Sequence, residues 1–191
     1  MELAGEKTFR DVVIESAGEE LFDCYQCYKC SAGCPVSINM DLLPHEIIRA
    51  VISNRKERAL SSKTIWVCAS CETCTTRCPN EIDIAKVMDV LRQMQIESGR
   101  EAREPKVPVF HRAFLDSIKK RGRVHELTMI RNYTQKSGDL KDKLKSGEWK
   151  NDVRLGMKMF LRGKLKIIPP KSGGVKEVRT IFEQAEEHKK R

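Results

Sequence analysis

Hydrophobic residues recur at helical spacing in several separate stretches of this chain. From Ile47 onward the apolar positions fall at i, i+1, i+4 and i+5, which predicts an amphipathic helix over residues 44–52 with Pro44 in its first turn. A longer apolar stripe over residues 82–94 predicts a second helix that ends near Gly99. The apolar faces of both helices are expected to pack against neighbouring helices.

The rest of the N-terminal half carries weaker signals. An opening helix is expected around residues 9–14. The apolar segment 65–67 is compatible with either a short strand or a helix, and its periodicity leaves both open. Asp41 or a neighbouring residue is expected to supply the N-cap of the helix over residues 44–52.

The C-terminal half has the same helical character. Apolar residues predict a helix over residues 105–122 and another over 124–133. Residues 152–162 are apolar at positions that leave the buried helix face ambiguous. Residues 167–174 contain two prolines and two glycines and predict a loop or linker, and residues 175–191 predict a charged terminal helix. The whole chain is therefore predicted to be all-α.

All eight cysteines of the chain lie in two copies of one motif. Each copy has the spacing C-x2-C-x2-C-x3-C-P, and the second repeats the first at a distance of 44 residues. The first copy contains Cys24, Cys27, Cys30 and Cys34, and the second contains Cys68, Cys71, Cys74 and Cys78. This is the ferredoxin-type run that binds [4Fe-4S] clusters, so the sequence predicts two [4Fe-4S] clusters as cofactors.

The fourth cysteine of each run is expected to ligate the cluster of the other run. Three closely spaced cysteines wrap three corners of a cubane, and the chain then leaves at the proline. In ferredoxins with two clusters, the fourth thiolate binds the second cluster. The expected ligand sets are therefore Cys24, Cys27, Cys30 and Cys78 for cluster 1, and Cys68, Cys71, Cys74 and Cys34 for cluster 2. The two motifs then form one crossed unit.

Two other uses of eight cysteines fit the pattern less well. Structural zinc sites take two C-x2-C pairs per ion, whereas these runs are triplets followed by a Cys-Pro. A disulfide framework is typical of small secreted domains, and the N-terminal residues lack the apolar core of a signal peptide. No stretch approaches the ~18 consecutive apolar residues of a membrane span. A cytoplasmic protein without a membrane span is expected.

Charge is distributed unevenly along the chain. Residues 1–99 contain 11 Lys and Arg against 15 Asp and Glu, whereas residues 100–191 contain 25 against 12. Basic and acidic residues are interleaved, and no nucleic-acid-binding motif accompanies them, so no nucleic-acid partner is expected. A nucleic-acid-binding protein with structural metal stays a distant alternative. We predict a helical ferredoxin-like domain with two clusters over 1–100 and a basic, mostly helical extension over 101–191 that docks on partner subunits.

The sequence contains cysteines that predict electron-carrying clusters, but no evident catalytic site. Neither a G-x-G-x-x-G loop nor a G-x-x-x-x-G-K-[ST] loop is present. No cysteine is left over as a nucleophile. The four histidines are scattered along the chain: His45, His111, His125 and His188. We expect a surface or capping role for His45, and structural or solvated roles for His111 and His125. Catalytic residues are therefore not expected in this chain. Aromatic residues beside the motifs, Tyr25, Tyr28 and Trp66, are expected to shield the clusters, and Lys29 and Arg77 to raise their potentials.

The chain resembles the family of iron–sulfur C subunits of heterodisulfide reductase from methanogenic archaea. The resemblance covers roughly residues 8–135 and is carried by both cysteine runs and by Leu43-Pro44-His45-Glu46 between them. It continues in Phe110-His-Arg-Ala-Phe114 and in Gly122-Arg123-Val124-His125-Glu126-Leu127. The cysteine runs alone are shared with succinate dehydrogenase-like, glycolate oxidase-like and lactate-utilisation iron–sulfur proteins. The stretch after them favours the named family.

The resemblance implies a non-catalytic electron-transfer subunit of an oxidoreductase complex. In that family, the iron–sulfur subunit relays electrons from a flavin-containing subunit to a Cys-Cys-Gly-containing subunit, which reduces the coenzyme M–coenzyme B heterodisulfide in methanogenesis. A hydrogenase or a formate dehydrogenase is the implied electron source of the flavin-containing subunit. This chain has no adjacent Cys-Cys pair. The alternative is an iron–sulfur relay subunit of another flavin- or quinone-linked dehydrogenase, of the glycolate or lactate type.

Overall fold

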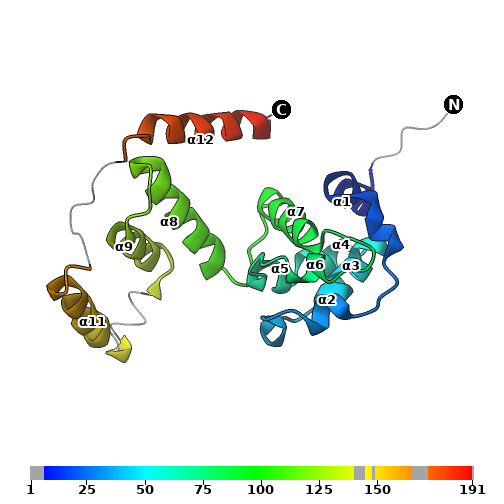
Figure 1. The fold of residues 1–191 in the computed structure, drawn as a ribbon, viewed down its shortest axis with the longest axis horizontal. Coiled ribbons are helices and arrows are strands. Elements are labelled where there is room, and N and C mark those ends of the chain that lie inside the picture. The colour runs from blue at the N-terminus through cyan, green and yellow to red at the C-terminus, as the bar shows by residue number, and fades with distance from the viewer. Residues whose placement is uncertain (1–6, 140–144, 148, 165–171, 191) are drawn as a thin grey trace. The chain divides into compact units, whose positions relative to one another are not determined.

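The computed structural model describes residues 7–139, 145–147, 149–164 and 172–190, with the side chains of 188–190 left out. Over these residues every regular element is a helix and no strand is present, so the prediction of an all-α fold is confirmed (Figure 1). No described helix has the length and apolar character needed to cross a bilayer. The chain forms two compact units, Met1–Pro105 and Lys106–Arg191, whereas the predicted division lay after residue 100.

Nine helical segments follow one another in the described part of the first unit. They are α1 (Phe9–Ala17), η1 (Glu19–Asp23), α2 (Lys29–Ala32), η2 (Ser37–Asn39), α3 (Pro44–Ile52), α4 (Lys56–Leu60), α5 (Thr64–Val67), α6 (Thr73–Thr76) and α7 (Ile84–Glu97). Helix α7 packs against α1, α4, α5 and α6, and α2 packs against α6. Fully buried aliphatic side chains fill the space between them: Val13, Leu21, Ile47, Val51, Leu60, Ile65, Val87 and Leu91. The core thus sits beside the two cysteine loops.

The longer helices of the first unit begin and end where their capping residues require. Thr8 caps α1 by a reciprocal pair of hydrogen bonds with Asp11. The Asp83 carboxylate accepts a hydrogen bond of 3.0 Å from the Lys86 N–H and caps α7. Helix α7 ends just before Gly99, whose φ of +68° is the left-handed conformation typical of a helix terminus. The helices predicted over residues 9–14, 44–52 and 82–94 are therefore present with modest shifts of their ends.

The N-cap of α3 was expected to be Asp41 or a neighbouring residue, and it is the neighbour Leu43. Leu43 precedes α3, and its N–H donates to the Glu46 carboxylate at 2.9 Å. Asp41 instead accepts hydrogen bonds at the start of α5, from Ser62 Oγ at 2.5 Å and from the Thr64 N–H at 3.2 Å. The segment 65–67, which was compatible with either a strand or a helix, lies within α5 and is helical.

The second unit is built on the pair of helices α8 (Lys106–Arg121) and α9 (Glu126–Lys136), followed by α11 (Trp149–Leu161) and α12 (Val175–Lys190). Helix α8 packs against both α9 and α12. Ala113 and Ser117 are buried on α8, and Ser117 Oγ accepts a hydrogen bond of 2.9 Å from the His125 N–H. Residues 167–171 of the predicted loop and the His188 side chain lie outside the described residues. The predicted helices of this half are otherwise present.

Candidate metal centre

The two cysteine loops repeat in three dimensions as well as in sequence. Gln26 and Ser70, which are 44 residues apart, have φ angles of +59° and +49°. Tyr28 and Glu72, at the same separation, have φ angles of +66° and +56°. Non-glycine residues seldom adopt the left-handed conformation, so its recurrence at matched positions shows that both loops share one backbone shape.

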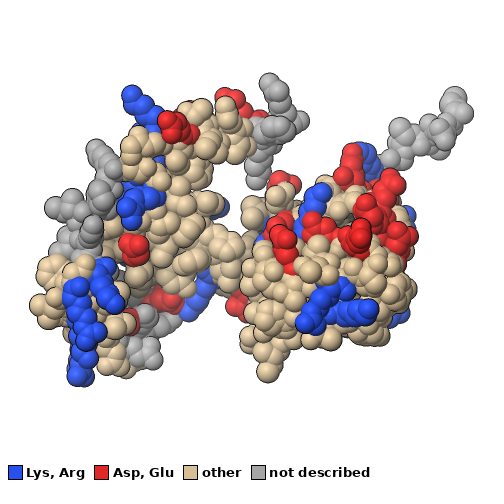
Figure 2. All heavy atoms as spheres, in the orientation of Figure 1, with Lys and Arg blue, Asp and Glu red and all other residues tan. Residues whose placement is uncertain are grey.

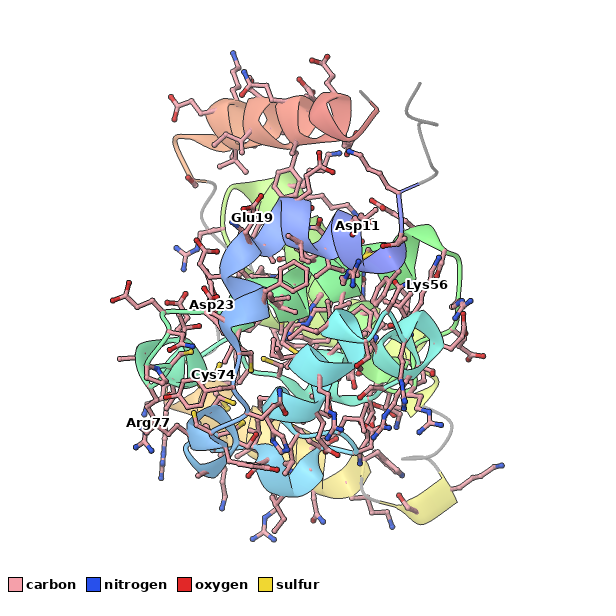
Figure 3. The ribbon with its side chains drawn as sticks, turned by 90° about the vertical axis from the view of Figure 1, so that its right-hand side faces the viewer. Asp11, Glu19, Asp23, Lys56, Cys74 and Arg77 are labelled. Atoms are coloured by element: carbon pink, nitrogen blue, oxygen red, sulfur yellow. The ribbon has the colours of Figure 1, made fainter. Side chains whose placement is uncertain are left out.

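Short helices carry the third cysteine of each run. Cys30 lies in α2 and Cys74 lies in α6, and each of these four-residue helices ends two residues before the fourth cysteine. The two helices pack against each other. A Cβ atom added at Gly33 would lie 2.6 Å from Arg77 Cδ, so the end of α2 and the Arg77 side chain are in close contact. Figure 3 shows Cys74 with Arg77 on its outer side. The repeat therefore brings its two halves face to face.

One cavity is lined by cysteines from both motifs. Its walls include Cys34 from the first run together with Cys68, Cys71 and Cys74 from the second. The rest of the lining includes the apolar Met40 and Met88 and the polar Ser70, Glu72 and Thr73. These four cysteines are the set expected for cluster 2.

The segment after the second motif returns to the start of the first. The Asn80 side-chain amide, two residues after Cys78, donates a hydrogen bond to the Asp23 carbonyl, which directly precedes Cys24. Desolvation raises the pKa of the Tyr25 phenol, and the nearby Cys27 and Cys78 thiolates raise it further. Cys78 thus lies close enough to Tyr25 of the first motif to affect its pKa, and its assignment to cluster 1 stays a prediction.

The pKa values of two buried cysteine thiols fit a site that holds positively charged iron. Burial raises the pKa of Cys74 to about 11, with the charge of Cys68 acting in the same direction. Burial likewise raises the pKa of Cys30, and the neighbouring Cys24 and Cys27 add to this effect. Thiolates are the form that binds iron, and buried thiolates need positive charge beside them. Iron bound at these positions supplies that charge, so the donor set fits [4Fe-4S] clusters.

A site for a single metal ion differs from a site for a cluster. Across the part of the chain that the structure describes, no three His, Cys, Asp or Glu side chains converge on the position of a single ion. Each thiolate of a [4Fe-4S] site binds a different iron atom, so its four sulfurs surround a cluster. Cys27 and Cys71 occupy matched positions of the repeat and are exposed, whereas Cys30 is buried.

Polar side chains around cluster 1 were not predicted from the sequence. Gln26 Nε2 donates to Cys24 Sγ at 3.3 Å and to the His45 carbonyl at 3.2 Å. Ser31 Oγ lies 2.7 Å from His45 Nδ1 and 3.8 Å from Cys30 Sγ. The expectation of a surface or capping His45 is wrong, because the residue is only 8% exposed and Leu43 is the N-cap of α3. The one available signal was position, since Gln26 and Ser31 adjoin cysteines.

The aromatic residues near the motifs differ in exposure. Trp66 is buried, and its indole N–H donates to the Gln95 side-chain carbonyl. Tyr25 and Tyr28 are each more than half exposed. The Tyr28 ring packs on His45 with centroids 4.3 Å apart. The two tyrosines are therefore largely exposed on the first loop, and Trp66 belongs to the core.

Comparison with known proteins agrees with this geometry. Residues 20–82 match the family model of the 4Fe-4S dicluster domain. The matched range begins just before Cys24 and ends after Cys78, so it contains all eight cysteines. The prediction of two [4Fe-4S] clusters as cofactors is confirmed.

Curated relatives of the chain are the C subunits of heterodisulfide reductases. The C subunit of an H2:CoB-CoM heterodisulfide, ferredoxin reductase from Methanothermobacter marburgensis is 29% identical over 49% of this chain and 51% of its own length. The C subunit of a ferredoxin:CoB-CoM heterodisulfide reductase from Methanosarcina acetivorans is 38% identical over 40% of this chain and 30% of its own length. A second iron–sulfur C subunit of CoB–CoM heterodisulfide reductase, from Methanocaldococcus jannaschii, is 31% identical over 50% of this chain and 55% of its own length. The chain thus spans about half the length of these relatives, or less, and the resemblance seen in its sequence is confirmed.

Proposed function

We propose that this chain, a relative of the iron–sulfur C subunits of heterodisulfide reductases, is the electron-transfer subunit of such a complex. In this role it passes electrons from a flavin-containing subunit to a Cys-Cys-Gly-containing subunit that reduces the coenzyme M–coenzyme B heterodisulfide. The observation that supports the proposal most is the cavity lined by Cys34 and by the second cysteine run, since a cluster held there would link the two cysteine loops.

The residues of the chain would hold the two cofactors close together. Cys24, Cys27, Cys30 and Cys78 would hold cluster 1, and Cys68, Cys71, Cys74 and Cys34 would hold cluster 2. When bound, a [4Fe-4S] cluster takes up and releases one electron at a time. With crossed fourth ligands, Cys34 and Cys78 would each bind the cluster of the other loop and so limit the distance between the two sites.

The exposed cysteines suggest where partners approach. Cys27 and Cys71 are exposed at matched positions of the repeat, so each loop presents one ligand at the protein surface. Two exposed ligand positions, one per loop, suit a relay with an entry and an exit. We infer that the flavin-containing and Cys-Cys-Gly-containing partners contact the unit near these two loops, and that the basic unit from Lys106 onward adds to the docking surface.

The chemistry of disulfide cleavage is assigned to a partner. Reduction of a disulfide to two thiols takes up two electrons and two protons. Every cysteine of this chain belongs to a cluster motif, and none forms an adjacent Cys-Cys pair. The chain therefore acts without a catalytic residue of its own, and the Cys-Cys-Gly motifs of the partner would carry the reaction. A hydrogenase or formate dehydrogenase would supply the flavin-containing partner with electrons.

Reconstitution without oxygen tests this role. The reduced flavin-containing partner and the Cys-Cys-Gly-containing partner are mixed with the heterodisulfide, with or without this chain, and thiol release is followed. Thiols should form only when the chain carrying about eight irons is added. The matched control is Cys68→Ser, which should support little or no turnover.

Three outcomes would contradict the proposal. The first is equal reduction of the Cys-Cys-Gly-containing partner in the absence of the chain, and the second is cleavage of the heterodisulfide by the chain alone. The third is purification of the chain with a glycolate- or lactate-type flavoprotein in place of the two named partners, which would favour the alternative dehydrogenase.

A further inference from the structure

One arginine of α7 reaches into the second cysteine loop. The Arg92 side chain is only 13% exposed, although it carries a full positive charge. Its Nε donates to the Ile65 carbonyl and its Nη2 donates to the Cys68 carbonyl. Its Nη1 donates to Ser70 Oγ at 3.0 Å and to Asp89 Oδ1 at 2.6 Å. The guanidinium therefore bonds to α5, to Cys68 at the start of the loop and to Ser70, whose backbone is in the left-handed conformation.

The first cysteine loop is held in a different way. Gln26 stands where Ser70 stands in the repeat, and it donates directly to Cys24 Sγ with a neutral amide. The residue 44 positions before Arg92 is Ile48, which is buried at 1% exposure. The fold thus places a cation at the second loop where the first half of the repeat has an aliphatic side chain. The two cluster sites are alike in backbone and unlike in electrostatics.

The charge of Arg92 is only partly neutralised by its ion pair. Asp89 is 53% exposed, so water screens its carboxylate much more than the guanidinium. Reduction adds a negative charge to a cluster, and a fixed cation nearby stabilises that charge more than it stabilises the oxidised state. A retained positive charge beside Cys68 consequently favours reduction at the second site.

We propose that Arg92 is a positioning residue that fixes the second cysteine loop and raises the reduction potential of the cluster held there. This proposal rests on the proposed ligand set of cluster 2. It concerns a property of the full chain alone and does not depend on any partner.

The test is a redox titration of both clusters, followed by electron paramagnetic resonance on the full chain purified without oxygen. Arg92→Gln should lower the reduction equilibrium constant of one cluster about tenfold, which is about 59 mV for one electron. Arg92→Lys keeps the positive charge without the forked hydrogen bonds and should leave that constant within about threefold, which separates the effect of charge from that of positioning. Lys86→Gln removes an exposed cation from the same helix and should change neither cluster.

A second variant shifts the potential in the opposite direction. Asp89→Asn removes the carboxylate that pairs with Arg92 and should raise the reduction potential of the same cluster. This measurement is available even if the Arg92→Gln protein fails to bind two clusters. The cluster affected is identified as the one that is lost in Cys68→Ser. The absence of any shift in Asp89→Asn would show that charge around Arg92 does not reach the cluster, and that result overturns the proposal.

Two further results also overturn it. They are equal shifts of both clusters and a shift of the cluster lost in Cys24→Ser. A failed electron relay to the Cys-Cys-Gly-containing partner would leave these potentials unchanged, so the two proposals fail separately.

Discussion

Asp41 shows how one carboxylate organises the chain next to the second cysteine loop. Burial alone would raise its pKa, but hydrogen bonds from Ser62, Lys63 and Thr64 outweigh that effect and lower it to about 2. Because α5 leads directly into Cys68, these bonds help to place the loop. The same side chain also pairs with Arg103 at 3.4 Å.

We predict that Asp41→Asn lowers the free energy of unfolding by about 1–2 kcal/mol at pH 7, through the loss of charged hydrogen bonds on a partly solvated group. A group with a depressed pKa contributes stability above its unfolded value of 3.8, and the contribution disappears as the pH falls toward about 2. The difference between the two proteins should accordingly stay constant from pH 8 to pH 5. Urea unfolding followed by circular dichroism measures it, with Glu19→Gln as the control. A difference that changes within this range would be inconsistent with the assignment.

At the scale of elements, the contact between α2 and α6 depends on a glycine. Gly33 ends α2 with ordinary helical backbone angles, so an alanine there suffers no backbone strain. The obstacle is the Arg77 side chain, which lies within 3.0 Å of the added Cβ at three atoms. Gly33→Ala is therefore expected to displace Arg77 and to cost about 1 kcal/mol.

A double-mutant cycle tests this contact. The cost of Gly33→Ala should vanish in an Arg77→Ala background, where the three atoms nearest to the new methyl group are removed. Urea midpoints of the four proteins give the coupling free energy. An equal cost in both backgrounds would show that the close approach at Gly33 is not what limits the substitution.

The long helices were predictable because local signals define them. Pro44 and the apolar stripe after Ile47 mark α3, and Gly99 marks the end of α7. The short helices α2, α4 and α6 were not predicted. Helices of four or five residues are not stable in isolation, so their formation depends on tertiary contacts and on the cysteine loops they adjoin. The bonds that Asp41 makes likewise join residues more than 20 positions apart, beyond the reach of local patterns.

At the scale of the whole molecule, the two units differ in charge and in packing. On the first unit, Figure 2 shows acidic side chains gathered around α1, and Figure 3 places Asp11, Glu19 and Asp23 there. The second unit leaves large apolar side chains of α11 exposed, among them Trp149, Leu155 and Phe160. Exposed apolar side chains and a positive balance fit the predicted role of the extension in docking on partners, which remains a prediction.

The cluster ligands were predictable to a greater degree than their surroundings. Cysteine spacing alone named all eight thiols, because a cubane demands a fixed set of donors. The polar groups that distinguish the two sites, such as Gln26 and Arg92, were not recognised. Their partners come from other helices, and single-sequence patterns do not show which helices meet. The family resemblance led to the proposed role in a complex. The structure revealed that the polar and charged groups beside the two cysteine loops differ.

The crossed pairing of the motifs is tested most directly by spectroscopy of Cys34→Ser. Electron paramagnetic resonance of the reduced variant, purified without oxygen, is compared with that of Cys68→Ser and Cys24→Ser. The account predicts that Cys34→Ser matches Cys68→Ser, because both disturb the cluster in the cavity that they share. It also predicts that Cys78→Ser matches Cys24→Ser. If Cys34→Ser instead reproduces the spectrum of Cys24→Ser, each motif binds its own cluster and the crossed unit does not exist.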